Sequence, residues 1–271
     1  MYVVGAQGYL GSRVMASALG AGVEATAVSR SGDTRHGISS ISWSQLLKDL
    51  SAKPGRRTEV IWILDGAKHN ELDRLSDLLG VAGEAIYITA VSSCTVYGDQ
   101  QGRSCDETTP RSLMTDNAQL KAACEDALEA SSVSYSALRL GALYGVDDRG
   151  VRQDRIEKWV TEAAREGSVT VPEPTHWRGW LHREQGARAL LRAASRRIEG
   201  VFNVASSNYR FGDAAAFAAT HFDAAVASDG KDDPMDYRID STKAERACLL
   251  DQLGGEALPD AVTSFAEQYK L

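Results

Sequence analysis

A short apolar strand candidate that runs directly into three regularly spaced glycines constrains this chain most. Tyr2–Val4 precedes Gly5, Gly8 and Gly11, and Ser12–Leu19 follows with helical periodicity. Such a turn needs glycine for its tightness, for close approach of a pyrophosphate and for packing of the helix on the strand. The helix N-terminus then presents free N–H groups to the phosphates. We therefore interpret the segment as a dinucleotide-binding turn rather than a plain structural turn.

Composition and charge exclude several classes of function. The 271 residues suffice for one large α/β domain with a smaller appendage. A net charge of -7 with scattered Lys and Arg argues against a nucleic-acid partner. No run approaches the roughly 18 apolar residues of a membrane span and no basic leader precedes the first strand, so we expect a cytoplasmic protein without membrane contact. The four cysteines are far apart in sequence, which favours free thiols and no metal site.

Apolar strand candidates alternate with helical patterns over much of the chain, as in βαβ units. After the turn the strand candidates are 24–28, 38–43, 60–64, 85–90, 136–140 and 201–205, and the intervening helices are 69–79, 115–130 and 184–194. This order predicts an α/β Rossmann fold, a doubly wound parallel sheet with helices on both faces.

The pattern also predicts a division of the chain. Residues 1–145, with 178–205 returning to them, form the expected nucleotide-binding core. Residues 146–177 and 206–271 form a small substrate-binding lid. In this lid 152–165, 211–220, 241–249 and 258–268 are predicted as helices and 169–174 as a loop.

Further segments make the chain resemble the extended short-chain dehydrogenase/reductase superfamily, within it the NAD-dependent epimerase/dehydratase group. They are Ser92–Asp99, Asp106–Pro110, Arg139–Gly145, Arg178–His182, Gly200–Val204 and Asp240–Ala244. The first is similar to the Ser-Ser-x-x-Val-Tyr-Gly segment of sugar-nucleotide epimerases. The resemblance covers nearly the whole chain and implies a nicotinamide cofactor, a small-molecule substrate and, as in many members, a homodimer.

Catalysis in that family depends on Tyr-x-x-x-Lys, one helix after a serine. The resemblance places Ser93 and Lys121 at the serine and lysine, but Asn117 stands where the tyrosine belongs. An amide has no proton to give or take near neutral pH, whereas acid–base help is typically worth about 10²–10⁴ in rate. The catalytic candidates are therefore Ser93, Asn117 and Lys121 in an atypical member. The third strand also lacks the usual acidic residue near the adenine, and Asp65 replaces a small apolar residue.

Arg30 follows the second strand, where an arginine accommodates a 2′-phosphate, so we expect NADP, with NAD as the alternative. A solvated loop arginine is the other interpretation. The expected cofactor-binding residues are Gly5, Gln7, Gly8, Tyr9, Leu10, Gly11, Arg30, Asp65, Gly66 and Lys121. The resemblance implies the substrate-binding candidates Ser93, Cys94, Tyr97, Tyr144 and Arg178. For Arg178 an ion pair, and for Tyr97 and Tyr144 packing, are the alternatives.

Three hypotheses of function follow. The leading one is an NAD(P)-dependent oxidoreductase or epimerase-like enzyme that acts on a small metabolite through a non-standard site. A second is an NADP-binding regulator or scaffold without turnover. A third is a non-redox enzyme that reuses the substrate cleft, which would suit Asp65 and Asn117.

Overall fold

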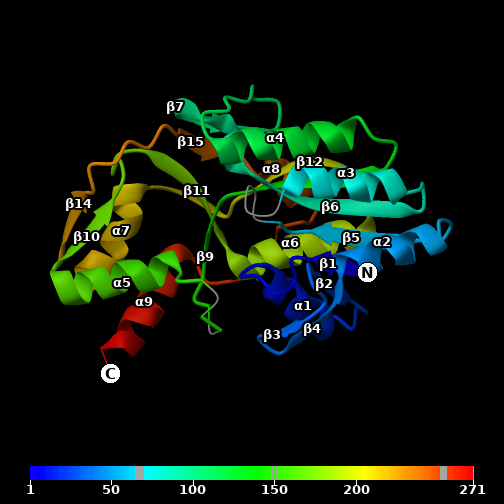
Figure 1. The fold of residues 1–271 in the computed structure, drawn as a ribbon. Coiled ribbons are helices and arrows are strands. Elements are labelled where there is room, and N and C mark those ends of the chain that lie inside the picture. The colour runs from blue at the N-terminus through cyan, green and yellow to red at the C-terminus, as the bar shows by residue number, and fades with distance from the viewer. Residues whose placement is uncertain (65–69, 148, 151, 251–254, 271) are drawn as a thin grey trace.

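The structure, a computed structural model, describes residues 1–64, 70–147, 149–150, 152–250 and 255–270. Its main feature is a sheet of order β12-β8-β6-β5-β1-β2-β4-β3, in which only β3 runs antiparallel to its neighbour (Figure 1). These strands are β1 (Tyr2–Val4), β2 (Thr26–Ser29), β3 (Thr34–Arg35), β4 (Ile38–Ser42), β5 (Thr58–Trp62), β6 (Ile86–Ser93), β8 (Ser134–Leu140) and β12 (Gly200–Val204). The parallel sheet of the predicted Rossmann fold is confirmed.

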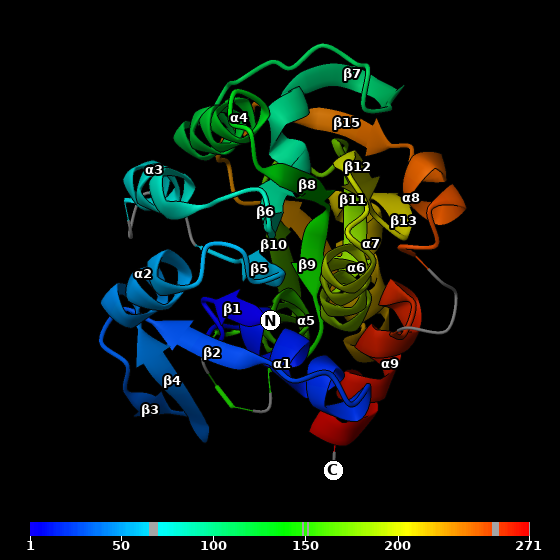
Figure 2. The same cartoon turned by 90° about the vertical axis from the view of Figure 1, so that its right-hand side faces the viewer.

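Helices cover both faces of this sheet (Figure 2). One face carries α1 (Gly11–Gly20) and α6 (Arg183–Arg196), and the other α2 (Trp43–Ala52), α3 (Glu71–Val81) and α4 (Asp116–Glu129). Because both faces are covered, central strand residues such as Ile61, Trp62 and Ile88 are fully buried. The chain leaves β1 toward β2 and returns to β5 on the opposite side, which opens a crevice at the carboxyl ends of β1 and β5.

A second group of elements lies beside the carboxyl edge of the sheet (Figure 1). The helices α5 (Arg155–Glu166), α7 (Phe211–Ala219) and α9 (Leu258–Tyr269) and the paired strands β10 (Ser168–Val171) and β14 (Ala225–Ser228) surround their own buried cluster, the outer cluster. Its centre includes Trp159, Trp180 and Phe211, whose rings meet edge to face. The domain boundaries stay a prediction. Ala244 and Leu249, inside the predicted lid segment, pack into the cluster under α1 and α6 instead.

Short elements connect the two parts. The strands β9 (Ala142–Tyr144), β11 (Trp177–His182) and β13 (Ser207–Arg210) form a small sheet, and β7 (Asp99–Cys105) pairs with β15 (Asp236–Ile239). The described residues also include α8 (Thr242–Arg246) and the 3₁₀ turns η2 (Cys94–Tyr97) and η3 (Thr220–Phe222).

The structure corrects the sequence interpretation in places. Residues 168–171 form β10, although 169–174 was predicted as a loop, because β10 gains a partner in the distant β14. The helix α2 was not predicted, although its local signals are clear. The Ser42 hydroxyl caps it by accepting a hydrogen bond from the Gln45 amide at 3.2 Å, and Leu46 and Leu50 bury its inner face.

The predicted absence of a membrane span and of a metal site can be examined only for the described residues. In the described part, no helix is both long and apolar enough to cross a membrane, and no three His, Cys, Asp or Glu side chains gather as metal ligands. The cysteines are free thiols, with Cys94, Cys105 and Cys124 buried and Cys248 exposed.

Candidate active site

The glycine turn between β1 and α1 is shaped for close approach of a ligand. Gly5 has φ +79°, and a side chain there would collide with the carbonyl oxygen of Ile63 just after β5. At Gly11, the first residue of α1, a Cβ would collide with the Gly5 carbonyl. Only glycine satisfies both the left-handed backbone and the contact. The turn therefore leaves bare backbone at the crevice between β1 and β5, which fits a dinucleotide.

A cavity of about 200 Å³ extends from this turn toward β2. Arg30, Trp43 and Arg74 line it together with Gln7, and the Arg74 guanidinium lies 5.7 Å from the centre of the Trp43 ring. The Gln7 amide donates to the Asp33 and Ile38 carbonyls at 2.9 and 3.1 Å, so it ties the loop after β2 in place. The exposed Arg30 side chain makes no hydrogen bond or ion pair with any described residue.

A larger cavity, of about 830 Å³, shares Gly5, Gly8, Ile63 and Leu64 with the first. The two are therefore one continuous groove along the carboxyl edge of the sheet. The larger cavity brings together the three catalytic candidates Ser93, Asn117 and Lys121. Its lining also includes Tyr9, Leu10, Gly11, Thr95, Arg152 and Arg155. Asp65 and Gly66, predicted to contact the cofactor, lie outside the described residues.

Ser93 and Asn117 are connected through Thr95. The Thr95 hydroxyl donates to Ser93 Oγ at 2.9 Å, the Thr95 amide donates to the same oxygen at 3.2 Å, and Asn117 Nδ2 donates to Thr95 Oγ1 at 3.3 Å. A hydroxyl oxygen has two acceptor sites, so these bonds occupy both on Ser93 and leave its own proton to donate. Ser93 thus caps η2 and can still donate a hydrogen bond into the cavity.

Lys121 is buried and bound to Glu71 at the start of α3. Its ammonium donates to both Glu71 carboxylate oxygens, at 2.7 and 2.8 Å, and to the Leu64 carbonyl at 3.1 Å. An ammonium has three donors, and these bonds use all three. The Trp62 indole also donates to Glu71, at 3.2 Å. The lysine predicted to hold a ribose therefore has no donor left for one in this arrangement.

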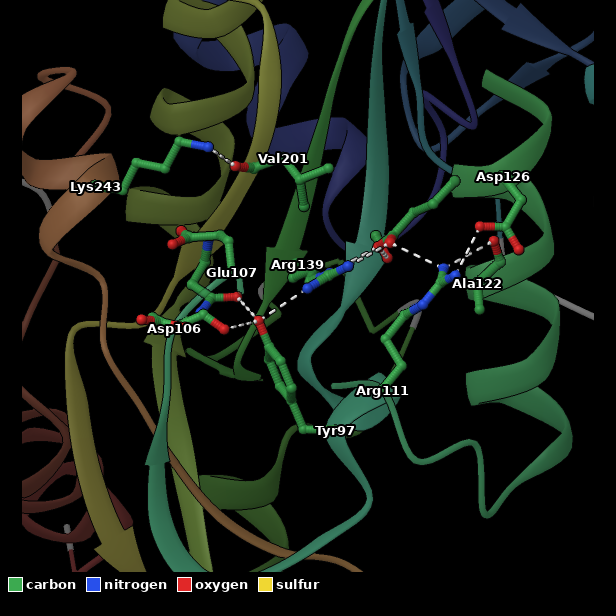
Figure 3. Close-up of polar contacts among 12 residues, drawn as sticks. Tyr97, Asp106, Glu107, Arg111, Ala122, Asp126, Arg139, Val201 and Lys243 are labelled. Atoms are coloured by element: carbon green, nitrogen blue, oxygen red, sulfur yellow. Dashed lines mark hydrogen bonds and ion pairs between the residues drawn. The ribbon is translucent and has the colours of Figure 1, made fainter. Parts of the chain in front are cut away.

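Tyr97 and Cys94 belong to a buried polar network rather than to the cavity lining. Arg139 binds the Glu125 carboxylate through two nitrogens, at 3.0 and 2.7 Å. It also donates to the Tyr97 hydroxyl at 2.9 Å (Figure 3). The Tyr97 hydroxyl donates to Asn203 at 2.7 Å, and the Cys94 thiol to the Arg139 carbonyl at 3.1 Å. Burial raises the pKa of both groups. Neither is suited to exchange protons with a ligand, so we leave both out of the proposed site.

Tyr144 and Arg178 are also engaged by the protein. The Tyr144 hydroxyl donates to the Glu256 carbonyl at 2.8 Å. Arg178, only 4% exposed, pairs with Asp233 at 2.5 Å and donates to the Trp177 carbonyl at 2.6 Å. Of the two roles predicted for Arg178, the structure contains the ion pair. Neither residue lines the cavity that contains Ser93.

Several residues of the groove were missed by sequence reasoning. Glu71 and Arg74 belong to no family motif, and Thr95 lies at a variable position of the Ser92–Asp99 segment. Arg152 and Arg155 were predicted only as part of a charged helix. The sequence does contain one usable signal: Asp154 precedes α5 with Glu157 three residues later, a capping box that fixes where the helix begins and so places Arg155 at its first position.

Comparison with known proteins agrees with this geometry. Residues 74–205 match the model of the NAD dependent epimerase/dehydratase family. No curated protein matches the sequence significantly. Among solved structures, MoeE5 in complex with UDP-glucuronic acid and NAD is 21% identical, with a TM-score of 0.76, and the match covers 100% of this chain and 99% of that one.

Two further structures show the same fold. The NAD-dependent NDP-hexosamine 5,6-dehydratase TunA is 18% identical, with a TM-score of 0.79 and coverage of 99% and 97%. The UDP-N-acetylglucosamine 4-epimerase from Bacillus cereus is 17% identical, with a TM-score of 0.75 and coverage of 99% and 96%. The family match over residues 74–205 and the shared fold make this chain similar to the NAD-dependent epimerases and dehydratases.

Proposed function

We propose that the chain is an NAD(P)-dependent, epimerase-like enzyme that acts on a small metabolite through a non-standard active site. One observation carries the proposal: the glycine turn opens into the same groove that contains Ser93, Asn117 and Lys121. A nicotinamide dinucleotide, when bound, supplies reversible hydride transfer at a carbon. The structural relatives are described with NAD and with UDP-linked sugars, so sugar nucleotides are the first substrates to assay.

Ser93 and Asn117 are the residues proposed to hold the substrate oxygen. The free proton of Ser93 can donate to a carbonyl or hydroxyl, and Thr95 fixes the Ser93 oxygen in place. The Asn117 side-chain carbonyl accepts no hydrogen bond from a described residue and can accept one from a substrate hydroxyl. Neither group titrates near neutral pH, so in this proposal the proton comes from water or from the substrate itself.

NADP is the proposed form of the cofactor. Two guanidinium groups, Arg30 and Arg74, line the end of the groove near β2, where a 2′-phosphate would lie. A charge-assisted contact from Arg30 predicts roughly tenfold tighter binding of NADPH than of NADH, and Arg30→Ala should remove that preference. Arg57→Ala, which removes an exposed arginine outside the groove, is the matched control in calorimetric titrations. Equal affinities for the two nucleotides in the wild type would remove NADP from the proposal.

The Lys121–Glu71 pair favours a second candidate, a protein that binds the nucleotide and does not turn it over, or that catalyses a non-redox reaction. Incubation with NADPH deuterated at nicotinamide C4 and a panel of keto-sugar nucleotides and simple carbonyl compounds, whose carbonyl carbons can accept the deuteride, separates the two. Transfer of deuterium to a substrate carbon supports the enzyme. Tight NADPH binding without transfer, together with nucleotide-dependent binding of a protein partner, supports the regulator.

The oligomeric state and the cellular location belong to the proposal as well. We expect a homodimer in the cytoplasm, and sedimentation equilibrium of the purified chain tests the first of these expectations.

A further inference from the structure

At the start of α5 the groove contains a guanidinium, that of Arg155, which has no acidic partner among the described residues. Arg155, the first residue of α5, lines the cavity that holds Ser93 and also a neighbouring cavity of about 270 Å³. Its side chain makes no hydrogen bond or ion pair with any described residue. A guanidinium carries five donors and a permanent charge, so leaving it unpaired in a partly buried site is costly unless a ligand binds there.

Aromatic rings hold the Arg155 side chain in place. Its guanidinium lies 5.5 Å from the centre of the Trp180 ring and 5.3 Å from that of Phe211. Both rings belong to the outer cluster, where they are nearly or fully buried. Stacking of this kind restrains the planar group and leaves its N–H edges free for hydrogen bonds. Arg155 is therefore preorganised, which lowers the entropy cost of binding a ligand.

The nearest carboxylates are committed to other partners. Asp154 accepts from the Tyr9 hydroxyl at 3.2 Å and from the Ile156 amide at 3.0 Å. Asp233 pairs with Arg178. Burial, followed by repulsion from Arg152 and Arg178, lowers the pKa of Arg155. An incoming anion would thus relieve an existing excess of positive charge at this wall.

Arg152 adds a second cation to the same cavity. It is exposed, and its guanidinium lies 5.2 Å from the centre of the Tyr9 ring. Arg178, by contrast, is neutralised by Asp233 and does not line this cavity. The available positive charge therefore faces the cavity that contains Ser93, with Arg152 beside Tyr9 of the glycine turn and Arg155 at the start of α5.

We infer that Arg155, assisted by Arg152, binds an oxyanion group of the substrate, a carboxylate or a phosphate, and so selects anionic small molecules. The inference rests on the proposed function, because it assigns the substrate class of the same groove. Two guanidinium groups match the charge of about -1.5 to -2 on a phosphate monoester and also suit a carboxylate, which an arginine fork binds through two parallel hydrogen bonds.

Isothermal titration of the NADPH-loaded protein with inorganic phosphate and, separately, with glycolate tests the inference and distinguishes the two anions. We expect one of them to bind saturably and Arg155→Gln to weaken it at least about tenfold. Arg155→Lys should weaken it less, because it keeps the charge and loses the fork. Arg165→Gln is the matched control: it removes the same charge from the same helix, at a position where Arg165 binds the Tyr269 hydroxyl outside either cavity.

Several outcomes would overturn the inference. These are no saturable binding of either anion, equal affinity in wild type and Arg155→Gln, or an equal loss in Arg165→Gln. If Arg155→Gln lacks a cooperative thermal transition, it is not folded, and the test then uses Arg155→Lys and Arg152→Gln. If both of these variants bind the anion with the affinity and stoichiometry of the wild type, the site is rejected. The same titrations without nucleotide separate the two proposals. Arg155-dependent anion binding in a protein that binds neither NADPH nor NADH would reject the proposed function and keep the anion site.

Discussion

The buried pair between Lys121 and Glu71 allows the sharpest test of the site's architecture. The Lys121 side chain is 6% exposed and that of Glu71 is fully buried. Removal of one member of a buried ion pair typically costs about 3–5 kcal/mol, because the other charge stays buried without the opposite charge that it had. We therefore expect Lys121→Met to lower the free energy of unfolding by about that amount. Since domains are stable by only about 5–15 kcal/mol, the effect should be plain in urea unfolding followed by circular dichroism.

The double variant Lys121→Met/Glu71→Gln separates the charge effect from packing. The amide oxygen introduced by Glu71→Gln would still accept a hydrogen bond from the Trp62 indole, which now donates to the Glu71 carboxylate at 3.2 Å. Replacing a whole buried ion pair by neutral groups is often close to neutral, so we expect most of the lost stability to return. A double-mutant cycle should then give a coupling energy of about 2 kcal/mol or more.

The same variants test whether Lys121 contacts the cofactor. Because the three ammonium donors of Lys121 are bonded within the protein, we expect the double variant to bind NADPH within about twofold of wild type. Additive losses in the cycle, or a single-variant loss under about 1 kcal/mol, would refute the argument for a tight buried pair. A tenfold loss of nucleotide affinity in the stable double variant would instead show that Lys121 reaches the ribose.

Three further perturbations follow from the structure. Gly5→Ala forces a side chain into a left-handed backbone and against the Ile63 carbonyl, so nucleotide affinity measured by calorimetry should fall at least tenfold, and unchanged affinity would contradict the cradle. Burial lowers the pKa of His182 to about 4, below its unfolded value of about 6.5, so its contribution to stability should decline as pH falls from about 6.5 toward 4. His182→Asn can keep the helix cap on the Glu184 amide, as His182 Nδ1 does at 3.2 Å, and should flatten that decline in thermal melts. Asn117→Tyr and Asn117→Ala should each lower the native turnover if the amide orients substrate, whereas a faster Asn117→Tyr enzyme would show that the site merely lacks its phenol.

Local signals in the sequence were sufficient for the elements that bear the groove. The glycine turn after Tyr2–Val4 predicted β1 and α1 because its constraints act within ten residues. The strands β5 and β6 were found because burial on both faces gives them runs of apolar residues, and β8 and β12 because buried apolar residues surround Arg139 and Asn203. By contrast, β10 has only four residues and β7 is mostly polar, and each is a strand because a distant segment pairs with it. The alternation in β10 spans only four residues, and β7 has one buried apolar residue, Cys105, so neither sequence identifies a strand by itself.

The candidate site was predictable as a set of positions, but not as a set of interactions. The resemblance brought Ser93, Asn117 and Lys121 into one cavity, and the structure places them there. What the positions can do depends on partners far away in sequence. Glu71 lies 50 residues before Lys121, and its carboxylate decides that the ammonium is bonded internally. Asp233 plays the same part for Arg178. Neither acid belongs to a recognisable motif, so the sequence did not predict either ion pair.

The groove contains both cations that are paired with a carboxylate and cations that have no acidic partner among the described residues, and this contrast best characterises the site. Lys121 at the centre is neutralised by a buried carboxylate, whereas Arg30 at the nucleotide end and Arg155 at the outer wall have no acidic partner among the described residues. Neutralising a buried cation favours stability, and leaving one unpaired is tolerable only where solvent or a ligand can meet it. The protein as a whole carries a net charge of -7, which repels anions. The two arginines create a local positive potential that attracts them to the groove. The groove is thereby electrostatically complementary to a ligand that has anionic groups near Arg30 and near Arg155.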